Sequence, residues 1–199
     1  MATLVIRGKG ETYVRLRMEG LLNPMTSYVN VRINNSTTGA GSANLNSGGG
    51  TDDGGATYYS DEWTSSNLSP STLYNFAASV ETTQVYWYYA SATTSASTRP
   101  LNWAWYTSKT SGTAFNITAT EWNAFCGRIN EFRVYKSLTN YSFTSAVSGN
   151  NAQASQINQA RTAINAMTPP TSVPAIVSSN GNCLQSTVNG LRDSLNSVA

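Results

Sequence analysis

Three segments in the last eighty residues of the chain repeat one helical pattern. They read EWNAFCGRINEF from Glu121, QINQARTAINAM from Gln156 and TVNGLRDSLNSV from Thr187. In each segment an apolar residue precedes an Asn, and a second Asn follows seven residues later. Apolar residues recur between them at the spacing of one helix face, so the repeat predicts three short amphipathic helices that cover one another.

Alignment on the first Asn places four apolar positions in register in all three segments. These positions are Trp122, Phe125, Ile129 and Phe132 in the first copy, Ile157, Ala160, Ile164 and Met167 in the second, and Val188, Leu191, Leu195 and Val198 in the third. Thr118 and Glu121 have the spacing of a capping box before the first copy. We therefore predict helices near 119–135, 154–167 and 184–198.

The repeated Asn residues flank the apolar stripe. They are Asn123, Asn130, Asn158, Asn165, Asn189 and Asn196. One interpretation makes them a ladder for a ligand, and the favoured one has their amides bonding the connecting loops or a neighbouring copy, because an unpartnered amide is costly. Cys126, Arg161 and Arg192 occupy equivalent positions, which argues against a shared catalytic group there.

The first half of the chain alternates apolar and polar residues with period two. Residues 13–19, 27–34 and 71–80 show the pattern most clearly, and turn-forming stretches separate them. Six or seven short strands of this kind are typical of a β-sandwich. The predicted fold is therefore α+β with two domains, a β-sandwich over 1–98 and a helical module over 99–199. Trp103 and Trp105, just after the boundary, should pack on the helices.

One turn in the first half resembles the fibronectin type III family. In LSPSTLYNFAASV the residues Leu68, Pro70, Thr72 and Tyr74 match that family's turn into its sixth strand. The resemblance covers about residues 3–97 and implies an immunoglobulin-like sandwich in which the Tyr74 hydroxyl bonds back to the loop backbone. The chain departs from the family where a buried Trp is usual, since Leu16 and Met18 hold the inward positions.

The second half resembles a module of bacteriophage and prophage proteins from Gram-positive gut bacteria. The stretch SGTAFNITATEWNAFCGRINEFRVYKSLTNYSF and the terminal NGLRDSLNSV carry the resemblance, which covers about residues 101–199. It implies a non-catalytic structural component of the virion, in the tail, neck or capsid exterior. The implied partners are other virion proteins and further copies of the chain. No secretion signal opens the sequence, so we expect assembly in the host cytoplasm and release by lysis.

Composition narrows the chemistry open to this chain. Charged residues make up 11%, the net charge is +2 and His is absent. The chain therefore lacks the commonest general base and metal ligand, and shows neither a basic stripe for nucleic acid nor an apolar run for a membrane. We predict no enzyme activity, cofactor or metal site. Asp52 and Asp53 lie among glycines and could form a calcium-binding loop, but the favoured interpretation is a flexible, solvated tip.

Aromatic residues give the alternative function. Some of them must lie outside the core of a sandwich, where they suit stacking on a sugar or contact with a protein. The candidate contact residues are Tyr58, Tyr59, Trp63, Tyr86 and Tyr88. The alternative function is thus an adhesin module for a host cell-surface glycan or receptor, while cross-strand pairing is the structural explanation. Cys126 and Cys183 are either two small buried thiols or one disulfide.

Overall fold

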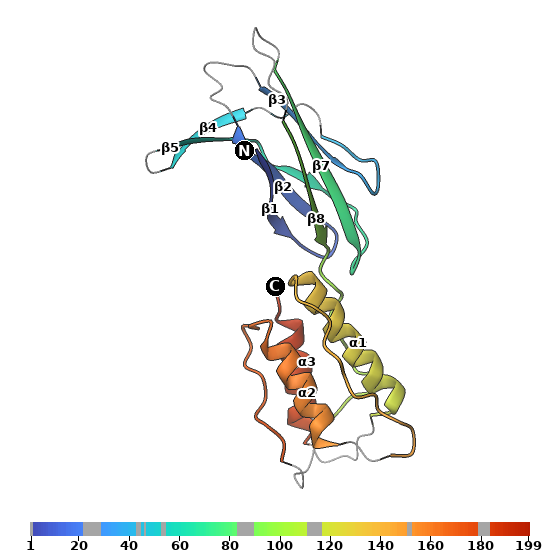
Figure 1. The fold of residues 1–199 in the computed structure, drawn as a ribbon. Coiled ribbons are helices and arrows are strands. Elements are labelled where there is room, and N and C mark those ends of the chain that lie inside the picture. Colours follow the sequence, from blue (N-terminus) through green and yellow to red (C-terminus); the bar gives the residue numbers. More distant parts are fainter. Residues whose placement is uncertain are drawn as a thin grey trace. The chain divides into compact units, whose positions relative to one another are not determined.

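The computed structural model describes residues 2–21, 29–42, 45, 47–52, 55–82, 90–110, 117–150, 153–178 and 184–199. Two compact units make up the chain, Met1–Arg99 and Pro100–Ala199. The first consists of strands and the second of helices with extended connections, so the fold is mixed α+β (Figure 1). The sequence predicted a boundary between residues 98 and 99.

The first unit contains two antiparallel sheets. Its strands are β1 (Thr3–Lys9), β2 (Val14–Leu21), β3 (Val29–Asn35), β4 (Ser47–Asp52), β5 (Gly55–Ser60), β6 (Trp63–Ser65), β7 (Leu73–Thr82) and β8 (Ala90–Ser97). One sheet has the order β1-β2-β5-β4, with β6 also paired to β2, and the other has the order β3-β7-β8. Strands β5 and β6 share one edge of β2, at Leu21 and at Leu16 respectively.

The two sheets bury their alternating apolar residues in one core. On β2 the residues Val14, Leu16 and Met18 are fully buried, as are Val31 and Ile33 on β3. The inward residues of β7 are Tyr74, Phe76, Ala78 and Val80, all 5% exposed or less. The period-two prediction is confirmed for these strands, because one face of each sheet covers the other.

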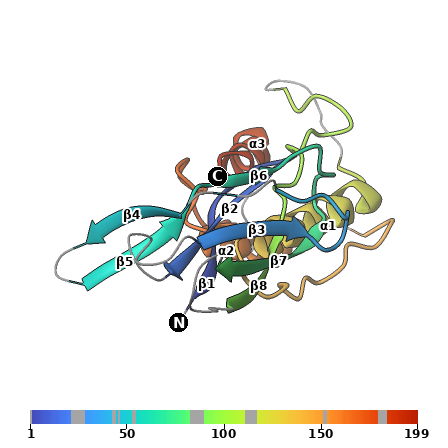
Figure 2. The ribbon, with the colours of Figure 1, turned by 90° about the horizontal axis from the view of Figure 1, so that it is seen from above.

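The glycine-rich stretch after β3 forms a strand. For residues 39–57 the sequence predicts either a long loop or a strand with a flexible end, and it favours a solvated tip for the Asp pair. In the structure β4 pairs with β5 from Ser47 to Asp52, and the two form a hairpin that extends beyond the other strands of the unit (Figure 2). Backbone hydrogen bonds make this pairing, so three consecutive glycines gave no side-chain pattern to predict it. Asp53 lies outside the described residues.

Tyr74 has the structural role that the turn predicted. The Ser69 N–H donates to Tyr74 Oη at 2.9 Å, and the ring is 5% exposed. The hydroxyl thus fixes the loop that leads into β7, which confirms that Tyr74 bonds back to the loop backbone.

The second unit contains the three predicted helices, α1 (Ala119–Tyr135), α2 (Ala154–Asn165) and α3 (Gln185–Asn196). All twelve positions of the aligned apolar stripe are buried and form one core. Trp103 and Trp105 join this core as predicted, and the Trp105 ring centroid lies 4.8 Å from that of Phe125. Helix α2 ends two residues before its predicted end, because Thr168 has φ of 50° and two prolines follow.

The capping box before α1 is only half formed. Thr118 Oγ1 accepts the Glu121 N–H at 3.1 Å, as predicted. The Glu121 carboxylate instead accepts from the Tyr106 N–H and from Lys109 Nζ. The predicted bond from the Glu121 side chain back to the cap is therefore replaced by tertiary contacts, since both donors belong to an extended segment that precedes the helix.

Candidate functional site

The repeated Asn side chains hold extended segments of the chain's own backbone. On α1, Asn123 Nδ2 donates to the Ala146 carbonyl at 3.0 Å, and the Ala146 N–H donates back to Asn123 Oδ1 at 2.9 Å. Asn130 makes the same two-way bond with Tyr141, at 3.1 and 2.8 Å. Each amide satisfies both polar groups of one peptide residue, as a neighbouring strand would.

The other two helices repeat this arrangement. On α2, Asn158 makes the two-way bond with Val177, at 2.8 and 3.0 Å. On α3, Asn196 makes it with Trp103, at 2.9 and 2.7 Å, while Asn189 Nδ2 donates to the Lys109 carbonyl at 2.9 Å. The prediction that these amides bond connecting loops is confirmed. Asn165 differs, because it is exposed and no such bond is seen for it within the described part of the chain.

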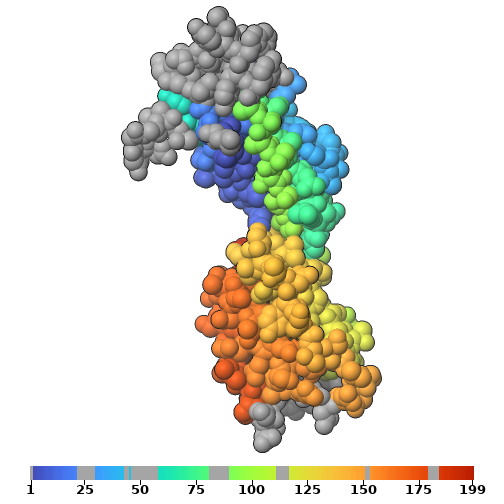
Figure 3. Space-filling view, viewed as in Figure 1, coloured from blue at the N-terminus to red at the C-terminus, as the bar shows by residue number. Residues whose placement is uncertain are grey.

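These bonds close the helical unit into a ring of three repeats. Helix α1 holds residues 138–147 and α2 holds residues 169–178, in each case the segment that follows the helix. Helix α3 holds residues 101–110, which precede α1 and are called here the closing segment. Figure 1 shows the helices side by side, and the segment after α1, gold in Figure 3, lies on the visible surface of this unit.

Each extended segment also contacts the next helix. Glu121 at the start of α1 accepts the backbone N–H of Tyr106 in the closing segment. At the equivalent position of α2, Gln156 Nε2 donates to the carbonyls of Thr144 and Ser145, at 3.4 and 3.3 Å. Ser194 of α3 donates to the Ser172 carbonyl at 2.9 Å in the segment after α2. Every segment therefore lies between two helices, so the apolar stripes alone do not define the unit.

A buried ion pair fixes the closing segment to α1. Lys109 Nζ lies 3.2 Å from Glu121 Oε2, and the two side chains are 0% and 3% exposed. Lys109 Nζ also donates to Thr107 Oγ1 at 2.8 Å. A charge this deeply buried is tolerated only when it is paired, so removal of either partner would leave the other uncompensated.

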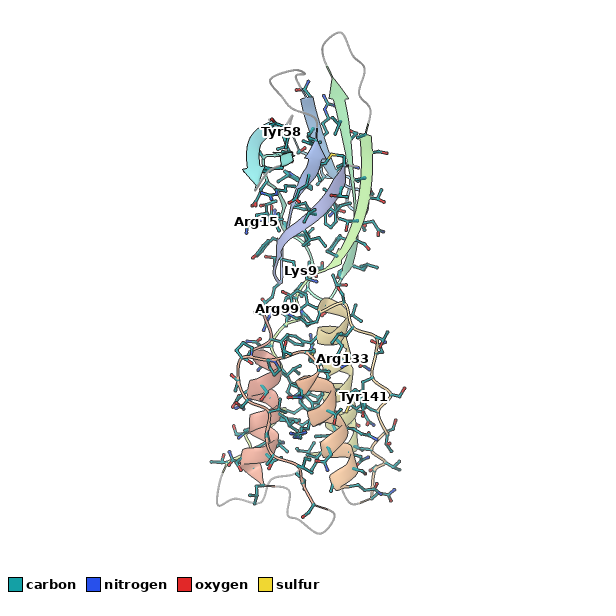
Figure 4. The ribbon with its side chains drawn as sticks, turned by 60° about the vertical axis from the view of Figure 1, so that its left-hand side comes forward. Lys9, Arg15, Tyr58, Arg99, Arg133 and Tyr141 are labelled. Atoms are coloured by element: carbon teal, nitrogen blue, oxygen red, sulfur yellow. The ribbon has the colours of Figure 1, made fainter. Side chains whose placement is uncertain are left out.

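Arg133 is a second buried cation, near the end of α1. Its Nε donates to the Thr139 carbonyl at 2.9 Å and its Nη1 donates to the Ala163 carbonyl at 3.0 Å. The guanidinium lies 5.8 Å from the centroid of the Tyr141 ring, and both residues are marked in Figure 4. Arg133 thus binds one carbonyl close to the C-terminal end of α2, where a positive charge is favourable, and one in the segment after α1.

A pocket of about 440 Å³ opens where the first two helices begin, and we call it the N-terminal pocket. Trp122, Ile157 and Val188 line it, and they are the equivalent first positions of the apolar stripe in α1, α2 and α3. The remaining lining residues are Ile117, Thr118, Ala119, Thr144, Ser145, Ala146, Val147, Ser148, Gly149, Asn150, Gln153 and Gln156. The repeat itself therefore contributes one apolar residue of the pocket from each helix.

The sequence assigned these three residues to the core and did not predict the pocket. The available signal was that each stripe begins at the same position, so the three first residues converge where the core ends. No charged side chain occurs among the described lining residues. Trp122 Nε1 is buried and has no acceptor within the described structure, which is also true of Trp103 and Trp105 outside the pocket.

The predicted contact aromatics do not share one face. Tyr58 on β5 pairs with Leu21 and Trp63 on β6 pairs with Leu16, and both rings are half-buried against the core of the first unit. Tyr58 is marked in Figure 4. Tyr59 pairs with Glu19 on the opposite face of the sheet, where the Arg17 guanidinium lies 4.2 Å from its ring centroid. Tyr86 and Tyr88 lie outside the described residues.

Charged side chains form ion pairs on the sheet that carries Tyr59. Glu62 binds Arg15 at 3.0 Å and Arg7 at 3.5 Å, and Glu19 binds Arg17 at 2.7 Å. Arg15 is marked in Figure 4. These side chains are 20–48% exposed, so each pair contributes little to stability. Three arginines and two glutamates thus form one ion-pair network on this sheet, with a net charge of +1.

The remaining groups offer little redox or metal chemistry in the described regions. Cys126 is a free thiol, and burial raises its pKa to about 12. Cys183 lies outside the described residues. Across the described ranges, no three His, Cys, Asp or Glu residues come together as metal ligands would. None of the helices described has the length and apolar content needed to span a membrane.

The chain resembles few known proteins, and only distantly. No protein-family model matches the chain, and no curated protein matches it. One similar solved structure is that of Astrotactin-2, described as a conserved vertebrate-specific and perforin-like membrane protein involved in neuronal development. The two are 14% identical with a TM-score of 0.33, and the match covers 83% of this chain and 28% of that one. A likeness this distant carries no argument about fold or function.

Proposed function

We propose that this chain is a non-catalytic structural component of a bacteriophage virion, in the tail, neck or capsid exterior. The observation that carries the proposal is the ring of amide bonds in the helical unit. Its repeated polar side chains bind the chain's own backbone, which suits a rigid body for assembly better than a site that turns over a substrate. The proposal also rests on the sequence resemblance to phage modules.

We further propose that the first unit is a fibronectin type III sandwich. The sheet orders β1-β2-β5-β4 and β3-β7-β8 correspond to the ABED and CFG orders of immunoglobulin-like sandwiches. The bond from the Ser69 N–H to Tyr74 Oη at 2.9 Å supports the same assignment. Such a unit would present its loops and outer faces for contact, while the helical unit serves assembly with other virion proteins and further copies.

Immunogold labelling tests the virion role. An antibody against the purified chain is applied to virus particles from a lysate of the cells that encode it. The proposal predicts gold at one repeated position on intact particles. Recovery of the chain only in the unassembled fraction would contradict it. Light scattering of the purified chain adds the oligomeric state that an assembly role requires.

The alternative function is a glycan- or receptor-binding adhesin module, and Tyr59 is the observation that favours it. Tyr59 lies on the outer face of its sheet, unlike Tyr58 and Trp63, and Arg17 stacks on its ring. A glycan array tests this function: binding that a Tyr59→Ala variant loses, with unchanged melting, would support the adhesin. Trp63→Ala is a poor probe, because that ring packs against the core.

A further inference from the structure

We propose that the N-terminal pocket binds a neutral saccharide that carries an acetamido group. The pocket belongs to the helical unit, so this site is separate from the aromatics of the first unit. Its volume of about 440 Å³ lies in the range of small-molecule sites, roughly 300–1,000 Å³.

The deep part of the pocket is apolar and comes from three helices. Trp122, Ile157 and Val188 are 6%, 4% and 0% exposed, and Ile117 adds a further aliphatic side chain. Such a surface accepts a methyl group or the apolar face of a sugar ring without leaving polar groups unbonded. The acetamido methyl is the small apolar group of a saccharide that fits this position.

The rim of the pocket is polar but uncharged. Ser148, Asn150 and Gln153 are exposed there, and their hydroxyl and amide groups both donate and accept hydrogen bonds. No charged side chain is present among the described residues around it, so a ligand's charge would enter unpaired and at a high cost. The lining therefore selects a neutral ligand rich in hydroxyls.

Trp122 contributes its apolar ring surface to this lining and not its N–H group. Its Nε1–H is buried and finds no acceptor in the described structure, although most buried polar groups in proteins are bonded. Trp103 and Trp105 share this condition but do not line the pocket. The unbonded N–H is thus shared by three buried tryptophans, and the ligand contact of Trp122 is made by its ring.

Calorimetric titration of the full-length chain tests the site. The probes are diacetylated chitobiose and cellobiose, which have the same linkage but differ in their acetamido groups. We expect chitobiose to bind about tenfold or more tightly than cellobiose, because only the acetylated sugar places a methyl group on the apolar floor. Equal affinities for the two sugars, or no binding of chitobiose, would overturn the proposal.

Two matched variants locate the binding. Ala119 lines the pocket at the first position of α1, while Ala154 has the same position in α2 and does not line it. Ala119→Leu should place a bulky side chain in the pocket and weaken chitobiose binding about tenfold or more, whereas Ala154→Leu should leave that binding unchanged. Thermal melting of both variants checks the fold. Unchanged binding in a folded Ala119→Leu variant would overturn the proposal.

Discussion

At the scale of single residues, the Asn amide is the side-chain group that the helical unit uses repeatedly to bind its own backbone. Asn123, Asn130, Asn158 and Asn196 each give one acceptor and one donor to a single backbone residue. No other uncharged side chain of that length offers both groups in one plane. The same side chain is thus used in all three repeats to hold an extended segment without a sheet.

Replacement of Asn196 by Ala should destabilise the helical unit by about 1–3 kcal/mol, because the Trp103 N–H and carbonyl lose their partners. Asn165→Ala is the matched control, since it has the same place in the repeat but is exposed. We expect its effect to stay within about 0.5 kcal/mol. Urea unfolding followed by tryptophan fluorescence measures both, and equal losses of stability would contradict the role of the two-way bond.

Cys126 should resist thiol reagents in the folded chain. Burial raises its pKa from 9.0 to about 12, so the reactive thiolate is scarce at pH 8. In a Cys183→Ser background we expect labelling at least about 100-fold slower than after denaturation. The folded pKa is the higher one, so this group has no effect on stability below pH 9 and lowers it as the pH rises from 9.0 toward about 12. Rapid labelling of the native chain would show that the thiol is exposed.

At the scale of elements, helices and extended segments alternate and pack closely. Gly190 on α3 shows how close this approach is, because a Cβ atom there would lie 2.7 Å from Pro174 Cγ in the segment that α2 holds. The segment is wedged between the two helices, since Arg161 of α2 also donates to the Pro174 carbonyl at 2.7 Å.

Gly190→Ala should therefore lower the free energy of unfolding by about 1–3 kcal/mol, since the proline ring cannot move away without displacing its segment. Gly127 on α1 is the control, because nothing lies within 4 Å of its added Cβ. Gly127→Ala should raise the free energy of unfolding by about 0.5–1 kcal/mol through helix propensity alone. Chemical denaturation of the two variants gives the comparison, and a stabilised Gly190→Ala chain would refute the close contact.

Much of this element structure follows from sequence periodicity. The stripes from Trp122, Ile157 and Val188 predict the helices because packing decides their buried face. Strands β2 and β7 are predicted in the same way by their alternation of apolar and polar residues. Strand β4 is not, because glycines carry no side-chain pattern. The position of the closing segment cannot be predicted from periodicity either, since Asn196 and Trp103 are 93 residues apart and no local pattern links them.

The candidate sites were less predictable than the elements, for two reasons. Tyr58 and Tyr59 are neighbours in one strand and must point to opposite faces, so strand alternation already separates them once the strand is known. The N-terminal pocket depends on where the helices of three distant repeats begin in space. Its floor residues therefore look like ordinary core positions in the sequence.

At the scale of the whole molecule, the chain joins two units that use different means to stay folded. The first covers one sheet with another and fixes a turn with Tyr74. The second closes a ring in which the last helix depends on the first segment after the boundary at Arg99. Residues 101–110 are therefore part of the helical fold and not a linker.

Two fragments test this central claim most directly, one of residues 100–199 and one of residues 117–199. They share all three helices, but only the longer one contains the closing segment with Trp103, Trp105 and Lys109. Thermal unfolding followed by circular dichroism should show a cooperative transition for the longer fragment and none for the shorter one. Two fragments that unfold cooperatively at the same temperature would contradict the closed ring.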